Sequence, residues 1–317
     1  MKRGVFSSFI LAIGLIYVIE IPCYGFWVWT PQTKKWINPK YAAKETPQKQ
    51  FDYAMDFFEK GNYEKAAEEF ERLIRSYPTS SLAPEAGYYG GLSYQRCELY
   101  YKAHLIYNKM ITQYPHSKRI SQIVENEYRI GNIFLEGKRR KILGVEILPA
   151  LNTAKKIFEG IVENLPYSEY GDDSQYKLGL VYKKMNNYQE AVEAFERVIK
   201  NYPQSALKEK AKYQIAFCLL KSSLPSDYDQ ETTDKAIEKF EDFIRGNPPT
   251  DLAEEAKEAI KELKDRKAKH EFDIAKYYED NNKYQAAIIY YESIIKNYPQ
   301  TEWAKVAEER LKNIKKE

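Results

Sequence analysis

The chain has 317 residues, of which 44% are hydrophobic and 30% are charged, and this composition excludes a disordered protein. Its 49 basic and 46 acidic residues leave a formal net charge of only +3, so nucleic acid is not expected as the main partner. Tyrosine is unusually frequent, at 28 residues, whereas glycine and proline number 14 each. Many tyrosines with few helix breakers favour long helices that meet through large, half-polar side chains.

The first 25 residues have the pattern of a secretory signal peptide. A basic start precedes a charge-free apolar run from Val5 to Ile19, which is shorter than the roughly 20 residues of a membrane span. Three fates of this segment remain open, namely cleavage after Gly25, lipid attachment at Cys23, or retention as an anchor. The residues Glu20-Ile21-Pro22 match a lipoprotein signal poorly, so cleavage is favoured. All three fates imply export to the periplasm.

Residues 26–49 form a leader that is rich in tryptophan and lysine. It contains three of the four tryptophans of the chain, and Pro31, Pro39 and Pro47 prevent a continuous helix across it. Exposed tryptophan side chains need a contact, so we favour an extended strap that lies on the first repeat. A docking segment for another molecule is the alternative.

One sequence phrase recurs six times after Gln50. An alanine is followed four residues later by Phe or Tyr, three residues after that by a bulky apolar residue, and five residues further on by proline. The alanines of this phrase are Ala66, Ala103, Ala154, Ala191, Ala236 and Ala287. The small residues that precede them, twelve residues earlier where nothing is inserted, are Ala54, Gly91, Gly131, Gly179, Ala216 and Ala275.

These spacings are typical of tetratricopeptide helix pairs. Small residues in helix A and at the start of helix B let the two helices approach closely, the aromatic residue one turn later fills the gap, and proline ends helix B. Six copies in register predict an all-α solenoid of about six helix-turn-helix repeats. Such an array buries its core between neighbouring repeats and offers its surface to other proteins.

The repeats divide the chain into four parts. We assign residues 1–25 to the signal peptide, 26–49 to the leader, 50–250 to repeats 1–5, and 251–317 to a long helix and the final repeat. Copy 3 carries an insertion from Lys138 to Pro149, and copy 5 has a longer loop around Pro225. The stretch from Asp251 to about Glu279 has no helix breaker, and its opposite charges three and four residues apart predict a long solvated helix.

Helix A of each copy carries an aromatic residue three positions before the small one. This row either fills the seam between repeats, which we favour, or lines a concave groove together with the residues four positions further on. The candidate groove-lining residues are Phe51, Met55, Tyr88, Leu92, Tyr128, Tyr176, Leu180, Tyr213, Phe217 and Phe272. A mixed, mostly apolar groove suits a peptide or a helix or strand of a partner protein.

The sequence contains no pattern of a catalytic, metal or cofactor site. The pair His270-Glu271 lacks the second histidine of a zinc-protease helix, because position 274 is Ile274. Phosphate loops, nucleophile elbows and dinucleotide fingerprints do not occur. Cys97 and Cys218 fall in repeats 2 and 5, too far apart for a disulfide, and are expected to be buried packing residues. We therefore expect neither an enzyme nor a bound cofactor.

The last third of the chain carries the most specific motifs. Its residues Asp265-Arg266-Lys267-Ala268-Lys269-His270-Glu271 run into Ala275-Lys276-Tyr277-Tyr278, followed later by Asn297-Tyr298-Pro299-Gln300-Thr301. With these motifs, the array over residues 50–317 resembles the BamD family of outer-membrane assembly lipoproteins.

The resemblance implies attachment at the inner leaflet of the outer membrane and a role in assembling β-barrel proteins. It also implies that the C-terminal repeats dock the barrel-forming subunit and that the N-terminal repeats receive unfolded outer-membrane proteins. Periplasmic repeat adaptors of the Tol, cell-division or wall-synthesis machinery share the Tyr-Pro helix ends and are the alternative. They usually carry a coiled coil before the repeats, whereas this chain has the tryptophan-rich leader.

Overall fold

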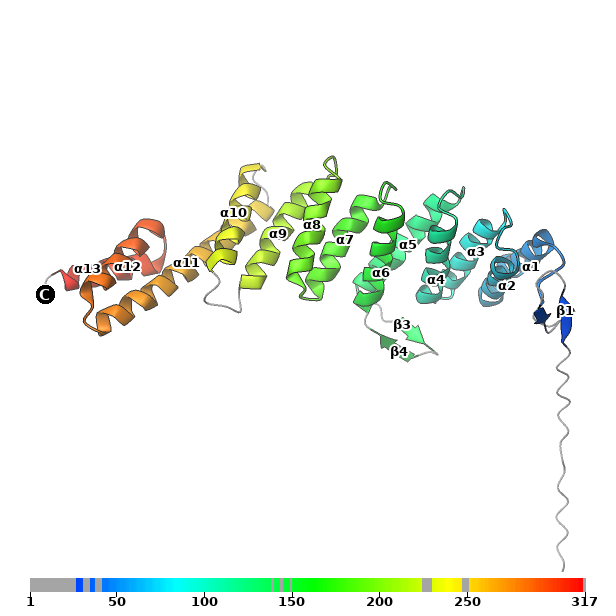
Figure 1. Cartoon of the computed structure of the whole chain (residues 1–317), viewed down its shortest axis with the longest axis horizontal. Helices are drawn as coiled ribbons and strands as arrows, with labels where there is room; N and C mark the ends of the chain where they lie inside the picture. The colour runs from blue at the N-terminus through cyan, green and yellow to red at the C-terminus, as the bar shows by residue number, and fades with distance from the viewer. Residues whose placement is uncertain are drawn as a thin grey trace, which may run out of the picture.

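The computed structural model describes residues 27–30, 35–37, 42–137, 140–142, 145–148, 150–223, 230–246 and 251–315. The expected signal peptide, Cys23 and the copy-5 loop around Pro225 lie outside the described residues. Figure 1 shows an elongated array in which the helices follow one another from α1 at one end to α11–α13 at the other. Within the described ranges, no helix combines the length and apolar character needed to cross a bilayer.

Consecutive helices form pairs that correspond to the six predicted copies. The first five pairs are α1 (Pro47–Glu59) with α2 (Tyr63–Ser76), α3 (Ala83–Arg96) with α4 (Tyr100–Gln113), α5 (Ile120–Leu135) with α6 (Ala150–Asn164), α7 (Gly171–Lys184) with α8 (Tyr188–Asn201), and α9 (Lys208–Ser223) with α10 (Gln230–Gly246). The sixth pair is the second half of α11 (Asp251–Asp280) with α12 (Tyr284–Asn297), and α13 (Glu302–Ile314) packs against both. The predicted tetratricopeptide solenoid is confirmed.

Each repeat is held together by a small residue of its first helix that faces an aromatic ring of its second helix. A Cβ atom added to Gly91 would lie 2.2 Å from Cε1 of Tyr107, and one added to Gly179 would lie 2.5 Å from Cε1 of Phe195. The second-helix aromatics are all fully buried, namely Phe70, Tyr107, Phe158, Phe195, Phe240 and Tyr291. Because there is no room for a larger side chain, these contacts fix the distance between the two helices.

The turn inside four of the repeats contains one residue in the left-handed region. These residues are Gly61, Glu98, Asn186 and Asn282, with φ of 75°, 57°, 61° and 57°. Glycine and asparagine adopt this conformation at little cost, whereas Glu98 does so with some strain. A single left-handed residue reverses the chain tightly enough to keep the two helices of a repeat in contact.

Tyrosines that end the second helix also bond to the segment that precedes their own repeat. The Tyr77 hydroxyl donates a hydrogen bond to the Lys44 carbonyl at 2.5 Å, and the Tyr114 hydroxyl donates one to the Pro78 carbonyl at 2.5 Å. The recurring Tyr-Pro pair therefore has two effects in these repeats. It ends a helix, and it links one inter-repeat loop to the preceding one.

Two short antiparallel hairpins stand outside the helical pairs (Figure 1). β3 (Arg140–Ile142) and β4 (Val145–Leu148) lie between α5 and α6 and form part of the copy-3 insertion. β1 (Val28–Thr30) and β2 (Lys35–Ile37) form the described part of the leader. The prediction that the leader lies as a strap on the first repeat is wrong for Trp27, Trp29 and Trp36, because these side chains are exposed on a hairpin whose two strands pair with each other.

The long helix and one of the two cysteines agree with expectation. α11 runs unbroken over Asp251–Asp280, which confirms the long helix predicted from about the same residues. Both Cys97 and Cys218 are free. Cys218 is fully buried and its pKa is raised to about 11 by that burial, so it is an inert packing residue. Cys97 is only half-buried, because it caps the end of α3 rather than lying inside a helix pair.

A buried pair of ionisable side chains connects repeats 2 and 3. His104 Nδ1 in α4 lies 2.5 Å from Glu127 Oε1 in α5, and both side chains are buried. The second carboxylate oxygen of Glu127 has no hydrogen-bond partner among the described residues. Burial raises the pKa of Glu127 above its ordinary value of 4.5, although the neighbouring His104 opposes this change.

The contact between Gly179 and Phe195 can be tested by adding one methyl group. Gly179→Ala should lower the free energy of unfolding by about 1–3 kcal/mol, because the new Cβ overlaps the ring. Gly160→Ala is the matched control within α6, since its Cβ would meet only the movable Asn108 Oδ1 at 3.2 Å. The control should be neutral or stabilise by up to about 1 kcal/mol. Urea unfolding measures both, and equal effects of the two changes would contradict the packing argument.

The buried Glu127 carboxyl should leave a signature in the pH dependence of stability. Because its pKa is raised in the folded state, its stabilising contribution is largest below 4.5 and is lost as the pH rises through the raised value. Glu127→Gln, which cannot ionise, should therefore gain stability relative to the unmodified protein across this rise. Urea unfolding at a series of pH values measures the difference. Glu125→Gln on the same helix is the control, and a pH-independent difference for Glu127→Gln would refute the assignment.

Candidate protein-binding groove

The hydrophobic core of the array is interrupted along α11. Ala256 and Leu263, in the first half of this helix, pack with α9 and α10. Ala268 and Phe272, in its second half, pack with α12 and α13. The polar segment 264–267 lies between the two cores. One helix therefore serves two repeats, and the sixth repeat does not stack on α10 as the earlier repeats stack on one another.

A cavity of about 680 Å³ lies where this stacking is interrupted. It is bounded by the start of α10 and the second half of α11. Its lining residues are Gln230, Thr233, Arg266, Lys267, Lys269, His270, Asp273, Ile274, Tyr277 and Tyr278. We call this cavity the α10–α11 groove.

The α10–α11 groove has a basic lining, with three cationic side chains, a histidine and only one carboxylate. Lys267 forms an ion pair with Asp234, and Lys269 forms one with Asp273 at 2.7 Å. The Arg266 guanidinium is only partly hydrogen-bonded. Its Nη2 lies 3.3 Å from a carboxylate oxygen of Glu262. The groove therefore attracts acidic groups, although each of its three cations already has one intramolecular carboxylate partner.

Arg266 is the cation of the groove with unused hydrogen-bonding capacity. Its Nη1 is buried and has no hydrogen-bond partner among the described residues. A buried guanidinium N–H without an acceptor is unfavourable, and a carboxylate is the acceptor whose geometry it fits best. The side chain is 27% exposed, so a carboxylate from another molecule can reach the guanidinium after a small rotation.

Aromatic side chains form the far wall of the groove. Tyr277 is 63% exposed, and its ring centroid lies 5.8 Å from that of Tyr278. Tyr278 stacks in turn on Tyr290 of α12, with centroids 5.7 Å apart. Tyrosine and arginine around a partly enclosed hollow are the residues that most often anchor protein–protein contacts.

The predicted aromatic row packs largely against the core. Within single repeats, Phe51 contacts Phe70, Tyr128 contacts Phe158, Tyr176 contacts Phe195, Tyr213 contacts Phe240, and Phe272 contacts Tyr291, with centroid separations of 5.3–6.0 Å. Phe51 also reaches Tyr89 of the next repeat, and Phe272 reaches Trp303 of α13. Tyr213 and Phe272 are buried. Tyr88 is half-buried beneath the guanidinium of Arg119.

The second predicted row is half-buried. Met55 packs against the core of the first repeats, and Leu180 packs against that of repeat 4. Leu92 is half-buried. Phe217 lies under the ammonium group of Lys183, whose Nζ is 4.3 Å from the ring centroid. Burial lowers the pKa of Lys183. The assignment of the ten predicted residues to a ligand groove remains a prediction, and of them the α10–α11 groove contains none.

Sequence reasoning missed the α10–α11 groove as a site, although its residues were visible. The basic run from Arg266 to His270 and the pair Tyr277-Tyr278 were noted only as motifs of the final repeat. The sequence does not show that the start of α10 lies opposite these residues. The described residues contain no group of three or more His, Cys, Asp or Glu side chains that could hold a metal ion.

Comparison with known proteins identifies the repeat type and the family. A tetratricopeptide-repeat model matches residues 50–80, and a model described as "Outer membrane lipoprotein", YfiO, matches residues 149–317. The outer membrane protein assembly factor BamD of Caulobacter vibrioides is 28% identical over 150 residues, which are 47% of this chain and 49% of that protein. The chain thus spans about half the length of this curated relative.

Solved structures of similar proteins are repeat proteins of low sequence identity. A thermophilic tetratricopeptide protein of Thermus thermophilus is 16% identical, with 68% of this chain and 99% of that chain covered and a TM-score of 0.33. A tetratricopeptide repeat protein of Parabacteroides merdae is 15% identical, with 84% and 98% covered and a TM-score of 0.33. The lipoprotein model covers more than half of the chain, including the whole α10–α11 groove. The chain belongs to the YfiO family of outer membrane lipoproteins.

Proposed function

We propose that this protein is a non-catalytic scaffold in the assembly of outer-membrane β-barrel proteins. Three observations support the proposal, namely the solenoid, membership of an outer membrane lipoprotein family, and likeness to a BamD assembly factor over about half of that relative. The protein would act from the periplasmic side of the outer membrane. Its partners would be the barrel-forming subunit and unfolded outer-membrane proteins. No observation favours the alternative of a Tol or wall-synthesis adaptor.

The α10–α11 groove is the observation that carries a partner-binding role. Its Arg266 has a buried N–H without an acceptor, its lining is basic, and Tyr277 projects at its rim. An acidic segment of the barrel-forming subunit would supply the missing carboxylate and cover the tyrosine. This pairing joins a charge-assisted hydrogen bond to burial of an aromatic ring, which is a common basis of strong local contacts.

The first four repeats would receive the unfolded substrate. The first helices of repeats 1, 2 and 4 carry the half-buried apolar side chains Met55, Leu92 and Leu180. Such a row can accept an extended or helical segment that offers alternate side chains. In this arrangement one array holds both a substrate and the assembly subunit, and its function depends on contact alone.

Reversing the charge of Arg266 should abolish binding at the groove. Arg266→Glu places a carboxylate against the acidic partner, so the affinity for the barrel-forming subunit should fall by roughly 30-fold or more. A photoreactive amino acid at position 277 should crosslink to that subunit in the unmodified protein and not in the Arg266→Glu variant. Affinity capture from envelopes, followed by identification of the captured chain, measures both effects.

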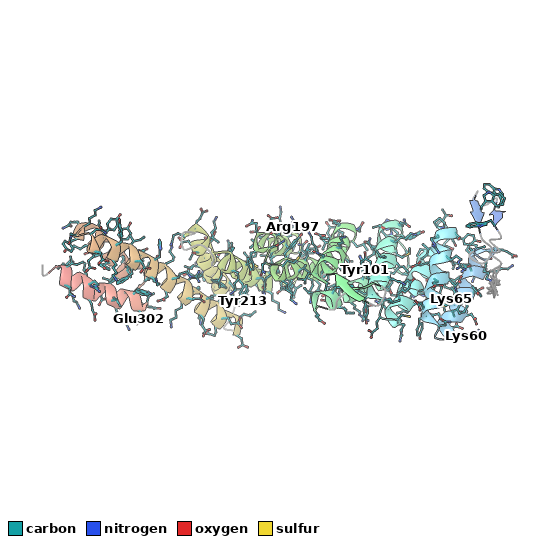
Figure 2. The ribbon with its side chains drawn as sticks, turned by 90° about the horizontal axis from the view of Figure 1, so that it is seen from below. Lys60, Lys65, Tyr101, Arg197, Tyr213 and Glu302 are labelled. Carbon is teal, nitrogen blue, oxygen red and sulfur yellow. The ribbon has the colours of Figure 1, made fainter. Side chains whose placement is uncertain are left out.

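Arg197→Glu is the matched control for this charge reversal. Figure 2 shows Arg197 in the middle of the array, on α8, and its side chain is exposed with a loose ion pair to Glu193 at 3.7 Å. Removal of such a pair changes stability by about 0–1 kcal/mol, so the fold should be retained. Equal capture by both variants would contradict the assignment of the groove.

Depletion of the protein from its native host should lower the amounts of outer-membrane β-barrel proteins. The physical reason is that unfolded barrels need a surface that holds them beside the assembly subunit before their strands close. Quantitative mass spectrometry of outer-membrane fractions measures the change, with lipoproteins that have no barrel as internal controls. Unchanged barrel levels together with capture of Tol or wall-synthesis proteins would favour the alternative adaptor.

A further inference from the structure

Three exposed tryptophans lie on the β1–β2 hairpin at the α1 end of the array. Trp27, Trp29 and Trp36 are 59%, 47% and 63% exposed. Trp29 and Trp36 are direct cross-strand partners, and their rings meet edge to face with centroids 5.9 Å apart. Figures 1 and 2 both show the hairpin beyond α1, at the tip of the array. We call the β1–β2 hairpin, together with these three tryptophans, the tryptophan hairpin.

The tryptophan hairpin is not a core element. The fourth tryptophan, Trp303, contacts Phe272 in the last core, as tryptophans of a soluble repeat normally do. Those of the hairpin instead expose about half or more of their surface to solvent, at a site that the repeat packing does not require. Exposed apolar clusters of this kind mark a surface that another phase or molecule covers.

The neighbouring sequence indicates that the surface that covers these tryptophans is a lipid membrane. Trp27 follows the apolar run that ends at Ile19 by eight residues and follows Cys23 by four. An extended chain spans at most about 3.5 Å per residue, so a lipid on Cys23 would hold Trp27 within about 14 Å of the bilayer surface. Residues 26–49 also contain five lysines against one glutamate, which favours anionic headgroups.

We propose that Trp27, Trp29 and Trp36 insert into the headgroup region of a phospholipid membrane. The indole ring is apolar over most of its area and carries one N–H donor, so it is most stable at the boundary between headgroups and acyl chains. The two strands pair along their inner edges, and the outer-edge N–H and C=O groups can bond water and headgroup oxygens in this hydrated layer, so the hairpin can enter the boundary without unfolding. If Cys23 carries a lipid, the hairpin is the second membrane contact, which makes the attachment stable. If the signal is cleaved after Gly25, the hairpin is the main contact.

The hairpin also sets which end of the array faces the membrane. It lies at the α1 end, whereas α11 and the α10–α11 groove lie near the opposite end (Figure 1). Membrane contact through the hairpin would thus leave the groove directed into the periplasm. The inference does not rest on the proposed function, since a membrane contact is compatible with any partner in the groove.

The test measures the depth of the tryptophans in a membrane. Protein isolated from envelopes is reconstituted with phosphatidylethanolamine and phosphatidylglycerol vesicles that carry bromine on the acyl chains, which quench nearby indoles. The unmodified protein should be strongly quenched. The triple variant W27S/W29S/W36S retains only Trp303 and should show no bromine quenching. The Cys23→Ala change removes the possible lipid attachment site. In a signal-cleaved form of that variant, the partition coefficient into vesicles should fall roughly tenfold for each tryptophan removed.

Tyr167→Ser is the matched control, because Tyr167 is an exposed aromatic residue outside the hairpin. It should leave quenching and partition unchanged. Equal quenching of the unmodified protein and the triple variant would overturn the proposal. So would quenching that disappears at about 1 M salt, where the Debye length is about 3 Å, because the lysines alone would then account for the contact. Loss of the hairpin should leave capture of the groove partner from detergent extracts intact, which separates this proposal from the proposed function.

Discussion

The close contact between a small residue on one helix and an aromatic ring on the next determines the rest of this structure. Gly91 against Tyr107 and Gly179 against Phe195 leave no space for a methyl group, so each helix pair has one allowed separation. Repetition of that separation gives a stack in which each repeat buries its apolar face only against its neighbours. The length of the array and the spacing of everything displayed on it follow from this contact.

The candidate binding site lies where two hydrophobic clusters of the array meet along one helix. α11 is long enough to complete the core of repeat 5 with Leu263 and to begin that of repeat 6 with Ala268. The polar residues between them contact α10 through ion pairs, Lys264 with Glu241 and Lys267 with Asp234, rather than through an apolar core. A basic hollow remains, with Arg266 incompletely hydrogen-bonded at its edge. An arrangement that is unfavourable for the isolated fold is thus favourable for binding an acidic partner.

The two ends of the array differ in chemistry, and that difference gives the molecule a direction. Exposed indole rings lie beyond α1, and a basic groove with an exposed tyrosine lies beside α11. Between them, buried contacts such as His104 with Glu127 and inter-loop hydrogen bonds such as Tyr114 with Pro78 hold successive repeats in a fixed relation. A stack held in this way can present its two ends at a defined separation, as a scaffold at a membrane requires.

The sequence by itself determined the repeat architecture, because the small, aromatic and proline positions act within a single helix pair and recur six times. The same local rules predicted α11, whose charges lie three and four residues apart. Only the tertiary structure decided which side chains of different elements face one another. The row from Phe51 to Phe272 packs against core aromatics, and the tryptophans of the leader are exposed on a hairpin rather than packed on the first repeat. The groove brings Thr233 opposite Arg266 across an interval of more than 30 residues, and no local pattern encodes that juxtaposition, since it depends on where one core ends and the next begins.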